Sequence, residues 1–194
     1  MFEKIKQRNL LIAGGIASVL IIVFLASTIV AQHPFEYGEV TSTTEATSTL
    51  PARLKIPAIN VDAAIEQVGL LPDGTMDVPK GPADVAWYEL GSHPGEIGSA
   101  VIAGHEGWKN NTRAVFDNLH TLQVGEKIYV EDADGTTITF IVREIRIYDP
   151  HQDASNVFSS NDGRAHLNLI TCEGVWNAVS KTYANRLIVF ADKE

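Results

Sequence analysis

The stretch Thr137-Ile-Thr-Phe-Ile-Val-Arg-Glu-Ile-Arg-Ile-Tyr148 is the clearest structural signal in the chain. It is rich in β-branched and aromatic residues over a long run, which favours a β-strand. The preceding Asp132-Ala-Asp-Gly135 is typical of a hairpin turn, and Leu71-Pro-Asp-Gly74 has the same turn chemistry. These features predict a domain built mainly from β-strands.

Outward from this run, short apolar segments are separated by turn residues, the pattern of a β-barrel or β-sandwich. Two short helices are predicted as well, around Ala83–Glu89 and over Thr112–Leu122. Long loops remain at Asp149–Ala165 and Glu173–Asn185, and long loops in a compact domain are often functional. The predicted strands are Arg53–Ile56, Ala64–Leu70, Ser99–Gly104, Lys127–Glu131, Thr136–Tyr148, His166–Thr171 and Arg186–Ala191.

The N-terminal part of the chain has the composition of a membrane anchor. Residues 10–31 carry no charged side chain and are long enough to cross a bilayer as a helix. Basic residues precede this run and none follows until Arg53, so residues 1–9 are expected in the cytoplasm and the rest outside. Ile29-Val30-Ala31 weakly resembles a signal-peptide cleavage site, but the apolar run exceeds the roughly 7–15 residues of a signal core. An uncleaved, single-pass anchor in the cell membrane is therefore favoured.

Two regions follow the anchor. Residues 32–50 are rich in Ser, Thr and Glu and have too few large apolar residues to pack into a core. This composition predicts a flexible stalk. Residues 51–194 have the size of one ordinary domain with a real core. Beyond residue 31 there are 12 Lys and Arg against 23 Asp and Glu. This acidic balance argues against nucleic acid or anionic lipid as a partner.

Cys172 is the only cysteine of the chain and stands at the end of the apolar run His166-Leu-Asn-Leu-Ile-Thr-Cys172. A single cysteine cannot form an internal disulfide. It is therefore an inert core residue, an intermolecular bridge or a nucleophile, and burial is common for free cysteine.

Three segments decide between these readings. They are Val101-Ile-Ala-Gly-His105-Glu-Gly, Leu169-Ile-Thr-Cys172 and Tyr183-Ala-Asn-Arg186-Leu-Ile-Val-Phe-Ala191. The chain closely resembles the sortase family, the cell-surface cysteine transpeptidases of bacteria, in the order of these motifs. A Gly-His comes first, then a Thr-Cys that ends a strand, and then an arginine that opens an apolar final strand. The resemblance runs from about Arg53 to Lys193. Further stretches resemble the class F group most, namely Val68–Pro79, Trp87-Tyr88 and Pro94–His105.

The resemblance implies a closed, eight-stranded β-barrel and a defined chemistry. Cys172 would attack a peptide carbonyl, His105 would move protons to and from amines, and Arg186 would stabilise the oxyanion. The backbone N–H of Glu173 would assist Arg186. The other residues expected to line the substrate groove are Thr171, Trp176, Val157 and Phe158. Expected partners are surface proteins with a C-terminal sorting signal and an amine acceptor, either a cell-wall precursor or a pilin lysine.

Several alternatives stay open at this point. Arg113 or Arg164 can replace Arg186, and the runner-up function is a noncatalytic extracellular β-domain that binds surface proteins or sorting peptides. L,D-transpeptidases would show Ser-His-Gly before the cysteine, and papain-like peptidases place cysteine before histidine. No cofactor or metal is expected: His105-Glu106 lacks the second histidine of a zincin helix, and Asp149, Asp153 and Asp162 fit solvated loop acids better than a calcium site.

Overall fold

The computed structural model describes residues 49–179 and 182–194. The predicted anchor at 10–31 and nearly all of the predicted stalk at 32–50 lie outside the described residues. Within the described part, no helix is long and apolar enough to cross a membrane.

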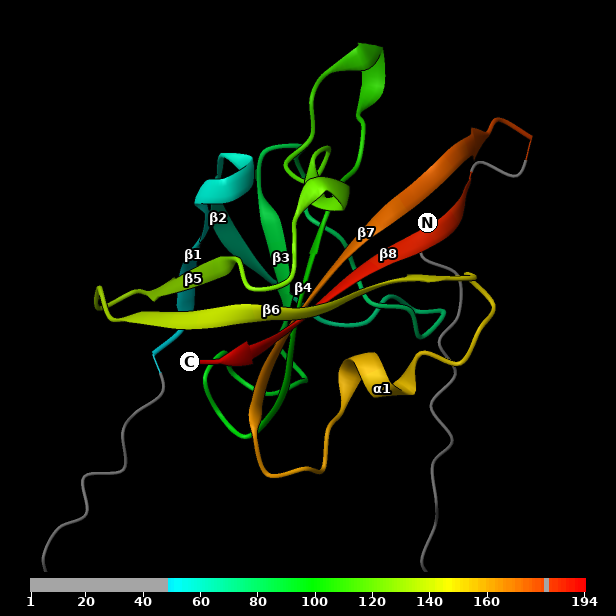
Figure 1. Cartoon of the computed structure of the whole chain (residues 1–194). Helices are drawn as coiled ribbons and strands as arrows, with labels where there is room; N and C mark the ends of the chain where they lie inside the picture. Colours follow the sequence, from blue (N-terminus) through cyan, green and yellow to red (C-terminus); the bar gives the residue numbers. More distant parts are fainter. Residues whose placement is uncertain (1–48, 180–181) are drawn as a thin grey trace, which may run out of the picture. The chain divides into compact units, whose positions relative to one another are not determined.

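Eight strands close into a barrel in the order β1-β2-β3-β4-β7-β8-β6-β5 (Figure 1). This confirms the predicted eight-stranded closed β-barrel. Closure leaves no free sheet edge along the barrel wall. The strands are β1 (Pro51–Ile56), β2 (Val61–Val68), β3 (Val85–Tyr88), β4 (Gly98–Gly104), β5 (Lys127–Asp132), β6 (Thr137–Tyr148), β7 (Ala165–Asn177) and β8 (Thr182–Lys193).

Within residues 49–179 and 182–194, helical structure is confined to short turns. The 3₁₀ turns are η1 (Pro57–Ile59), η2 (Lys109–Asn111) and η3 (Leu119–Thr121), and the only described α-helix is α1 (Ser155–Phe158) in the loop between β6 and β7. The two predicted turns are present: Gly74 N–H donates to Leu71 O and Gly135 N–H donates to Asp132 O. Both glycines have positive φ, which glycine adopts without steric cost.

Two segments predicted as helices fold differently. The segment Ala83–Glu89 contains strand β3, whose four residues are all buried. A short run buried on both faces shows no alternation, so its sequence does not distinguish strand from helix. In Thr112–Leu122 only the turn η3 is helical, although Phe116, Leu119 and Leu122 are buried together in the barrel core.

The third difference lies at the hairpin of β7 and β8. The predicted loop Glu173–Asn185 is mostly strand, because β7 and β8 continue to pair with each other through Trp176↔Tyr183 and Asn177↔Thr182. The register shifts between Glu173 and Trp176, where Gly174 has φ +91°. Figure 1 shows the two strands, orange and red, running side by side into this hairpin. Because this part is exposed, it lacks the apolar alternation of a buried strand.

The alternation of side chains divides the core in two. On β4, β7 and β8, one set of alternate residues fills the barrel interior, including Ile102, Leu169 and Val189. The other set points outward and packs beneath α1 and the β6–β7 loop. This second cluster includes Val101, Ala103, Val157, Ile170, Ile188 and Phe190. The residues expected to be catalytic continue the outward-pointing alternation at the ends of these strands. We call this side of β4, β7 and β8 the outer face.

Candidate active site

Cys172 and Arg186 are partners across two neighbouring strands. Cys172 on β7 lies directly opposite Arg186 on β8 in an antiparallel register. Directly opposite residues in such a pair project to the same side of the sheet, with Cα atoms about 4.5–5.5 Å apart. The side chain of Arg186 is 9% exposed, and its Nη1 donates to the Asn185 carbonyl at 2.9 Å. The register therefore brings a guanidinium beside the single thiol of the chain.

His105 follows β4, which borders β7 on its other side. The parallel register pairs Ala103 with Ile170. Its extension by two residues brings His105 level with Cys172, on strands about 4.8 Å apart. The buried Thr171 hydroxyl donates to the Gly104 carbonyl at 2.9 Å and ties the two strand ends together. The three polar residues singled out in the sequence thus converge at one end of the outer face.

The close approach of Phe116 explains the glycine before the histidine. A Cβ on Gly104 would collide with the Phe116 ring and with Val115. Phe116 is fully buried, and its N–H donates to the His105 carbonyl at 3.0 Å. The Gly-His pair therefore allows the strand end to pack against the segment 112–122 while the histidine turns outward.

The imidazole of His105 is fixed from two sides. Its Nε2 lies 2.8 Å from the carbonyl oxygen of Pro79, and the Trp108 ring packs against the imidazole at an interplanar angle of 59°, with centroids 4.7 Å apart. A carbonyl oxygen only accepts hydrogen bonds, so Nε2 must carry the hydrogen in the neutral ring. Nδ1 is then the ring atom at which a proton can be taken up and released.

Ionisable groups in this site, Cys172 and Glu106 among them, have perturbed pKa values. Burial raises the pKa of the Cys172 thiol, the Arg186 guanidinium opposes that rise, and the Glu106 carboxylate adds to it. Burial, together with the charges of Glu173 and Asp117, raises the pKa of Glu106 to about 7. Desolvation disfavours a charged carboxylate, and nearby carboxylates disfavour it further. Burial likewise favours the neutral form of the Cys172 thiol, so a base must remove its proton before the sulfur can attack.

Glu106, Pro79 and Tyr183 also belong to the site, although their sequence contexts predicted no role for them. The backbone carbonyl of Glu106 accepts a hydrogen bond from the Tyr183 hydroxyl at 3.1 Å. The side-chain Oε2 of Glu106 is buried without a hydrogen-bond partner among the described residues. The adjacent Gly107 N–H donates to Asp117 Oδ1 at 2.8 Å. Only the position of Glu106 beside His105 hinted at its place.

The residues predicted to line the substrate groove occupy different environments. Thr171 and Val157 are buried, the latter in the outer-face cluster. Phe158 packs edge-on to the Tyr88 ring at 5.6 Å. Glu173 lies opposite Asn185. Trp176 is 50% exposed and contacts the Tyr183 ring at 5.2 Å, on the hairpin beyond Cys172.

The alternative arginines lie elsewhere. Arg113 is exposed in the loop before Phe116. Arg164 precedes β7 and forms an ion pair with Asp192 at 3.2 Å, at the opposite end of the outer face. The strand register therefore favours Arg186 over both of them as the partner of Cys172.

Comparison with known proteins identifies the fold and the family. The sequence model of the sortase domain family matches residues 54–194 of this chain. A sequence search of curated proteins gave no match. Among solved structures, sortase C-1 from Actinomyces oris is similar with 28% identity and a TM-score of 0.56, over 74% of this chain and 73% of that one.

Two further structures agree with this result. The complex of Streptococcus agalactiae sortase C1 with MTSET is 26% identical with a TM-score of 0.57, covering 74% of this chain and 68% of that one. The lid mutant of sortase A from Corynebacterium diphtheriae is 25% identical with a TM-score of 0.58, covering 78% and 74%. The family match, the closed barrel and these neighbours agree: the chain belongs to the sortase family of cysteine transpeptidases.

Proposed function

We propose that the chain cleaves a sorting-signal peptide through a thioester at Cys172 and transfers the acyl part to an amine. The observation that carries the proposal is the alignment of His105, Cys172 and Arg186 at one end of three adjacent strands. Acyl transfer needs a nucleophile, a proton carrier and a group that stabilises an oxyanion, and these residue types supply all three.

The first half-reaction forms the acyl-enzyme. The Cys172 thiol gives its proton to His105, and its sulfur bonds to the carbonyl carbon of the peptide. The guanidinium of Arg186 and the N–H of Glu173 stabilise the negative oxygen of the tetrahedral intermediate. The carbon–nitrogen bond then breaks, and His105 returns the proton to the leaving amine.

The second half-reaction releases the acyl group. The nitrogen of an acceptor amine bonds to the thioester carbonyl carbon, and His105 takes the proton that this nitrogen loses. The carbon–sulfur bond breaks, and the proton returns to the Cys172 sulfur. A cell-wall precursor or a pilin lysine fits the role of acceptor. Glu106, Glu173 and Asp117 form an acidic surrounding that favours the approach of a cationic amine.

Two finer assignments rest on sequence. The apolar residues 10–31 support anchoring in the cell membrane, with the catalytic domain outside and the N-terminus in the cytoplasm. The stretches Val68–Pro79, Trp87-Tyr88 and Pro94–His105 support class F. Protease added to intact cells would remove the domain if this topology holds, and protection until lysis would contradict it.

The test of the activity is direct. The full-length chain, incubated with a peptide library, should form a peptide adduct on Cys172, and added hydroxylamine should convert it into hydroxamates of one peptide family; mass spectrometry reads both. Hydroxylamine serves as the amine that resolves the thioester. Peptide binding without any adduct or cleavage would support the noncatalytic alternative instead.

A further inference from the structure

The loop that follows β4 starts with His105 and is tied to the barrel by its backbone. Its first carbonyl, that of His105, accepts a hydrogen bond from the Phe116 N–H at 3.0 Å. Its second carbonyl accepts one from the Tyr183 hydroxyl at 3.1 Å. Phe116 is buried in the barrel core and Tyr183 belongs to β8, so both anchors are parts of the barrel itself.

Asp117 holds the next residue of the loop. Its Oδ1 accepts a hydrogen bond from the Gly107 N–H at 2.8 Å. Gly107 has φ +65°, a conformation that glycine adopts without steric cost. A Cβ at this position would also lie only 3.0 Å from the Tyr183 hydroxyl oxygen. The Asp117 carboxylate therefore closes the turn that leads the chain into Trp108.

Trp108 leaves this turn in extended backbone and is partly buried. Its ring packs against the His105 imidazole, with centroids 4.7 Å apart and an angle of 59° between the planes. The Lys109 ammonium lies 5.7 Å from the centre of the same indole ring. Because the backbone before it is anchored, the indole has a defined place beside the imidazole.

The two contacts of the imidazole restrain it in different ways. The contact between Nε2 and the Pro79 carbonyl oxygen, at 2.8 Å, fixes one ring atom. That atom lies close to the axis of the Cβ–Cγ bond, so the hydrogen bond only weakly restrains rotation of the ring about χ2. This torsion has broad, roughly two-fold preferences of its own. A ring packed against the imidazole restrains the rotation that the hydrogen bond permits.

We propose that Trp108 is a positioning residue of the reaction, whose ring holds the His105 imidazole in the orientation that presents Nδ1 to Cys172. Asp117 keeps Trp108 in place through the turn at Gly107. A half-turn about χ2 would bring the carbon Cδ2 to the position of Nδ1, and that carbon cannot exchange the proton. The inference rests on the proposed function for the reaction that it serves.

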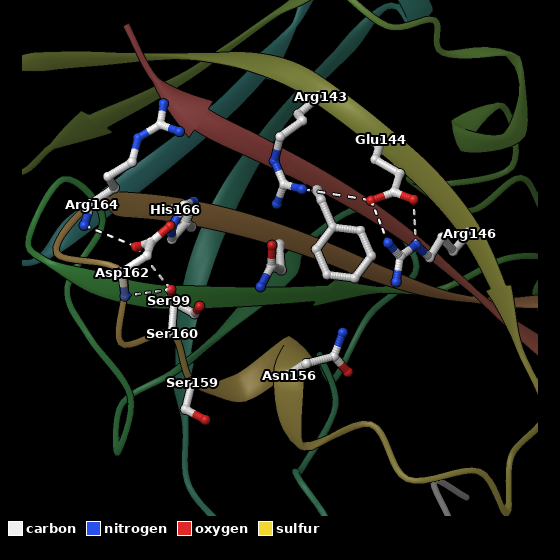
Figure 2. A pocket seen from close by; sticks show the side chains of 12 residues that line it. Ser99, Arg143, Glu144, Arg146, Asn156, Ser159, Ser160, Asp162, Arg164 and His166 are labelled. Atoms are coloured by element: carbon white, nitrogen blue, oxygen red, sulfur yellow. Dashed lines mark hydrogen bonds and ion pairs between the residues drawn. The ribbon is translucent and has the colours of Figure 1, made fainter.

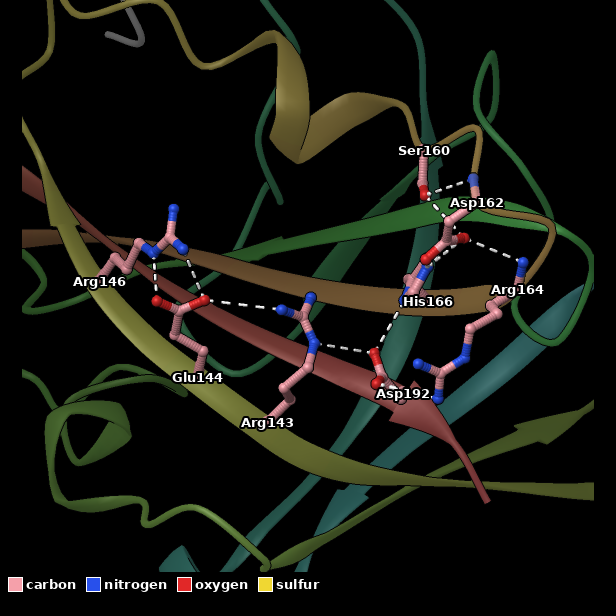
Figure 3. Close-up of polar contacts among 8 residues, drawn as sticks. All are labelled: Arg143, Glu144, Arg146, Ser160, Asp162, Arg164, His166 and Asp192. Atoms are coloured by element: carbon pink, nitrogen blue, oxygen red, sulfur yellow. Dashed lines mark hydrogen bonds and ion pairs between the residues drawn. The ribbon is translucent and has the colours of Figure 1, made fainter.

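The outer face provides a control far from this loop. A polar pocket of about 320 Å³ opens at its other end (Figure 2), and none of its lining residues is among those that hold His105. Figure 3 shows the contacts on its walls, in which the Arg146 guanidinium pairs with Glu144. Arg146→Gln therefore removes an ion pair of the same domain and leaves the histidine loop as it is.

The first test observes the imidazole and needs no activity. The full-length chain with ¹⁵N-labelled histidine is measured by NMR at about pH 9, where histidine rings are ordinarily neutral. The signal that His105→Gln lacks belongs to His105. Wild type should show one tautomer, with hydrogen on Nε2. Trp108→Ala and Trp108→Leu should show a mixture of tautomers, because a ring that turns breaks its Pro79 bond, whereas Trp108→Phe should resemble wild type.

The same measurement tests Asp117. Asp117→Ala removes the acceptor of the Gly107 N–H and should give the mixture of tautomers that Trp108→Ala gives. Asp117→Asn keeps an oxygen at this place and should retain the wild-type signal. Lys109→Gln removes the ammonium beside the indole but leaves the ring, and should retain the wild-type signal as well. Arg146→Gln should do the same.

The second test is kinetic and uses a peptide that the full-length chain cleaves. Trp108→Ala should lower kcat by about 10–100-fold, the size of loss that a misplaced reacting group causes. KM should stay close to the wild-type value, since the proposed role is to orient His105 and not to bind peptide. Trp108→Phe should recover most of kcat, and Arg146→Gln should react at the wild-type rate.

A wild-type His105 signal in both Trp108→Ala and Trp108→Leu would overturn the proposal, and so would a loss of kcat that Trp108→Phe does not recover. A tautomer mixture in Arg146→Gln would mark a general loosening of the domain and would overturn it too. The two tests separate this inference from the activity. A tautomer mixture in Trp108→Ala, in a chain that never cleaves a peptide, would uphold the orienting role and refute the transpeptidase. Cleavage by Trp108→Ala at the wild-type rate would do the reverse.

Discussion

Cys172 and Arg186 face each other across the antiparallel pair β7–β8, fourteen positions apart in sequence but directly opposite in register. The intervening hairpin contains Gly174 at positive φ, where the register shifts. Such a bulge disrupts the ladder locally and increases the twist of the strand, and pairing resumes beyond it. The register thus fixes which arginine accompanies the thiol.

Replacement of Cys172 by alanine should abolish the peptide adduct and hydroxamate formation. The change removes one sulfur atom from a half-buried position, so the thermal melting temperature should stay close to that of the wild type. Mass spectrometry of the intact protein and a melting curve check the two outcomes. Normal turnover by Cys172→Ala would refute the nucleophile, whereas a collapsed melting temperature would mark a structural cysteine.

Arg186→Lys should lower kcat/KM by about 10²–10³, the usual cost of losing an oxyanion-stabilising donor. A lysine keeps the charge but not the planar, multiply donating guanidinium. Steady-state kinetics with a cleaved peptide measure the loss. Arg113→Lys is the matched control and should react at the wild-type rate; an unimpaired Arg186→Lys would remove Arg186 from the site.

Thr171→Val should weaken both the fold and the reaction. The buried hydroxyl bonds the Gly104 carbonyl at 2.9 Å, and its loss should reduce the free energy of unfolding by about 1–2 kcal/mol. Because the bond joins the strand ends that carry Cys172 and His105, kcat should fall as well. Urea denaturation and kinetics test this. Thr171→Ser keeps the hydroxyl and should restore kcat; if it does not, the bond is not what positions the two residues.

Glu106→Gln should change how stability depends on pH. The pKa of Glu106 is about 7 in the folded chain, against an ordinary value of 4.5, so folding favours the protonated form. Between these two values the unfolded chain has lost the proton and the folded chain has kept it. Wild-type stability therefore falls as pH rises through this window, and the full cost is present above pH 7.

The glutamine cannot ionise, so the variant should melt at a higher temperature than wild type at pH 8, and the difference should fade below pH 4.5. Melting curves across pH measure it. Glu89→Gln changes an exposed carboxylate outside the site and should show no such trend. An equal difference at pH 8 and pH 4 would mean that ionisation of Glu106 is not the cause.

Much of the barrel was predictable, because strands and turns have residue preferences that can be seen in the local sequence. β6 was identified from its β-branched and aromatic run, and the turns at Gly74 and Gly135 from residues that tolerate positive φ. The motif residues His105, Cys172 and Arg186 were likewise marked by their strand-end contexts. Their roles in the reaction stay predictions.

Other features depend on which surfaces the rest of the chain buries. β3 is buried on both faces, so its sequence shows no alternation. The outer part of the β7–β8 hairpin is held by pairing between its two strands, and its β7 arm is exposed. The position of Glu106 among Glu173 and Asp117, which raises its pKa, likewise follows from packing. Sequence periodicity reports burial only where the two faces of an element differ.

The sequence by itself determined the strand-rich class, the turns and the three residue types that the chemistry needs, because these follow from local backbone preference and from side-chain chemistry. The tertiary structure alone decided which of them meet. His105 and Cys172 are brought together by the β4–β7 register, and Arg146 and His166 share a pocket because β6 and β7 both flank β8. Pairing between distant strands is set by the burial of whole faces, which no single segment encodes.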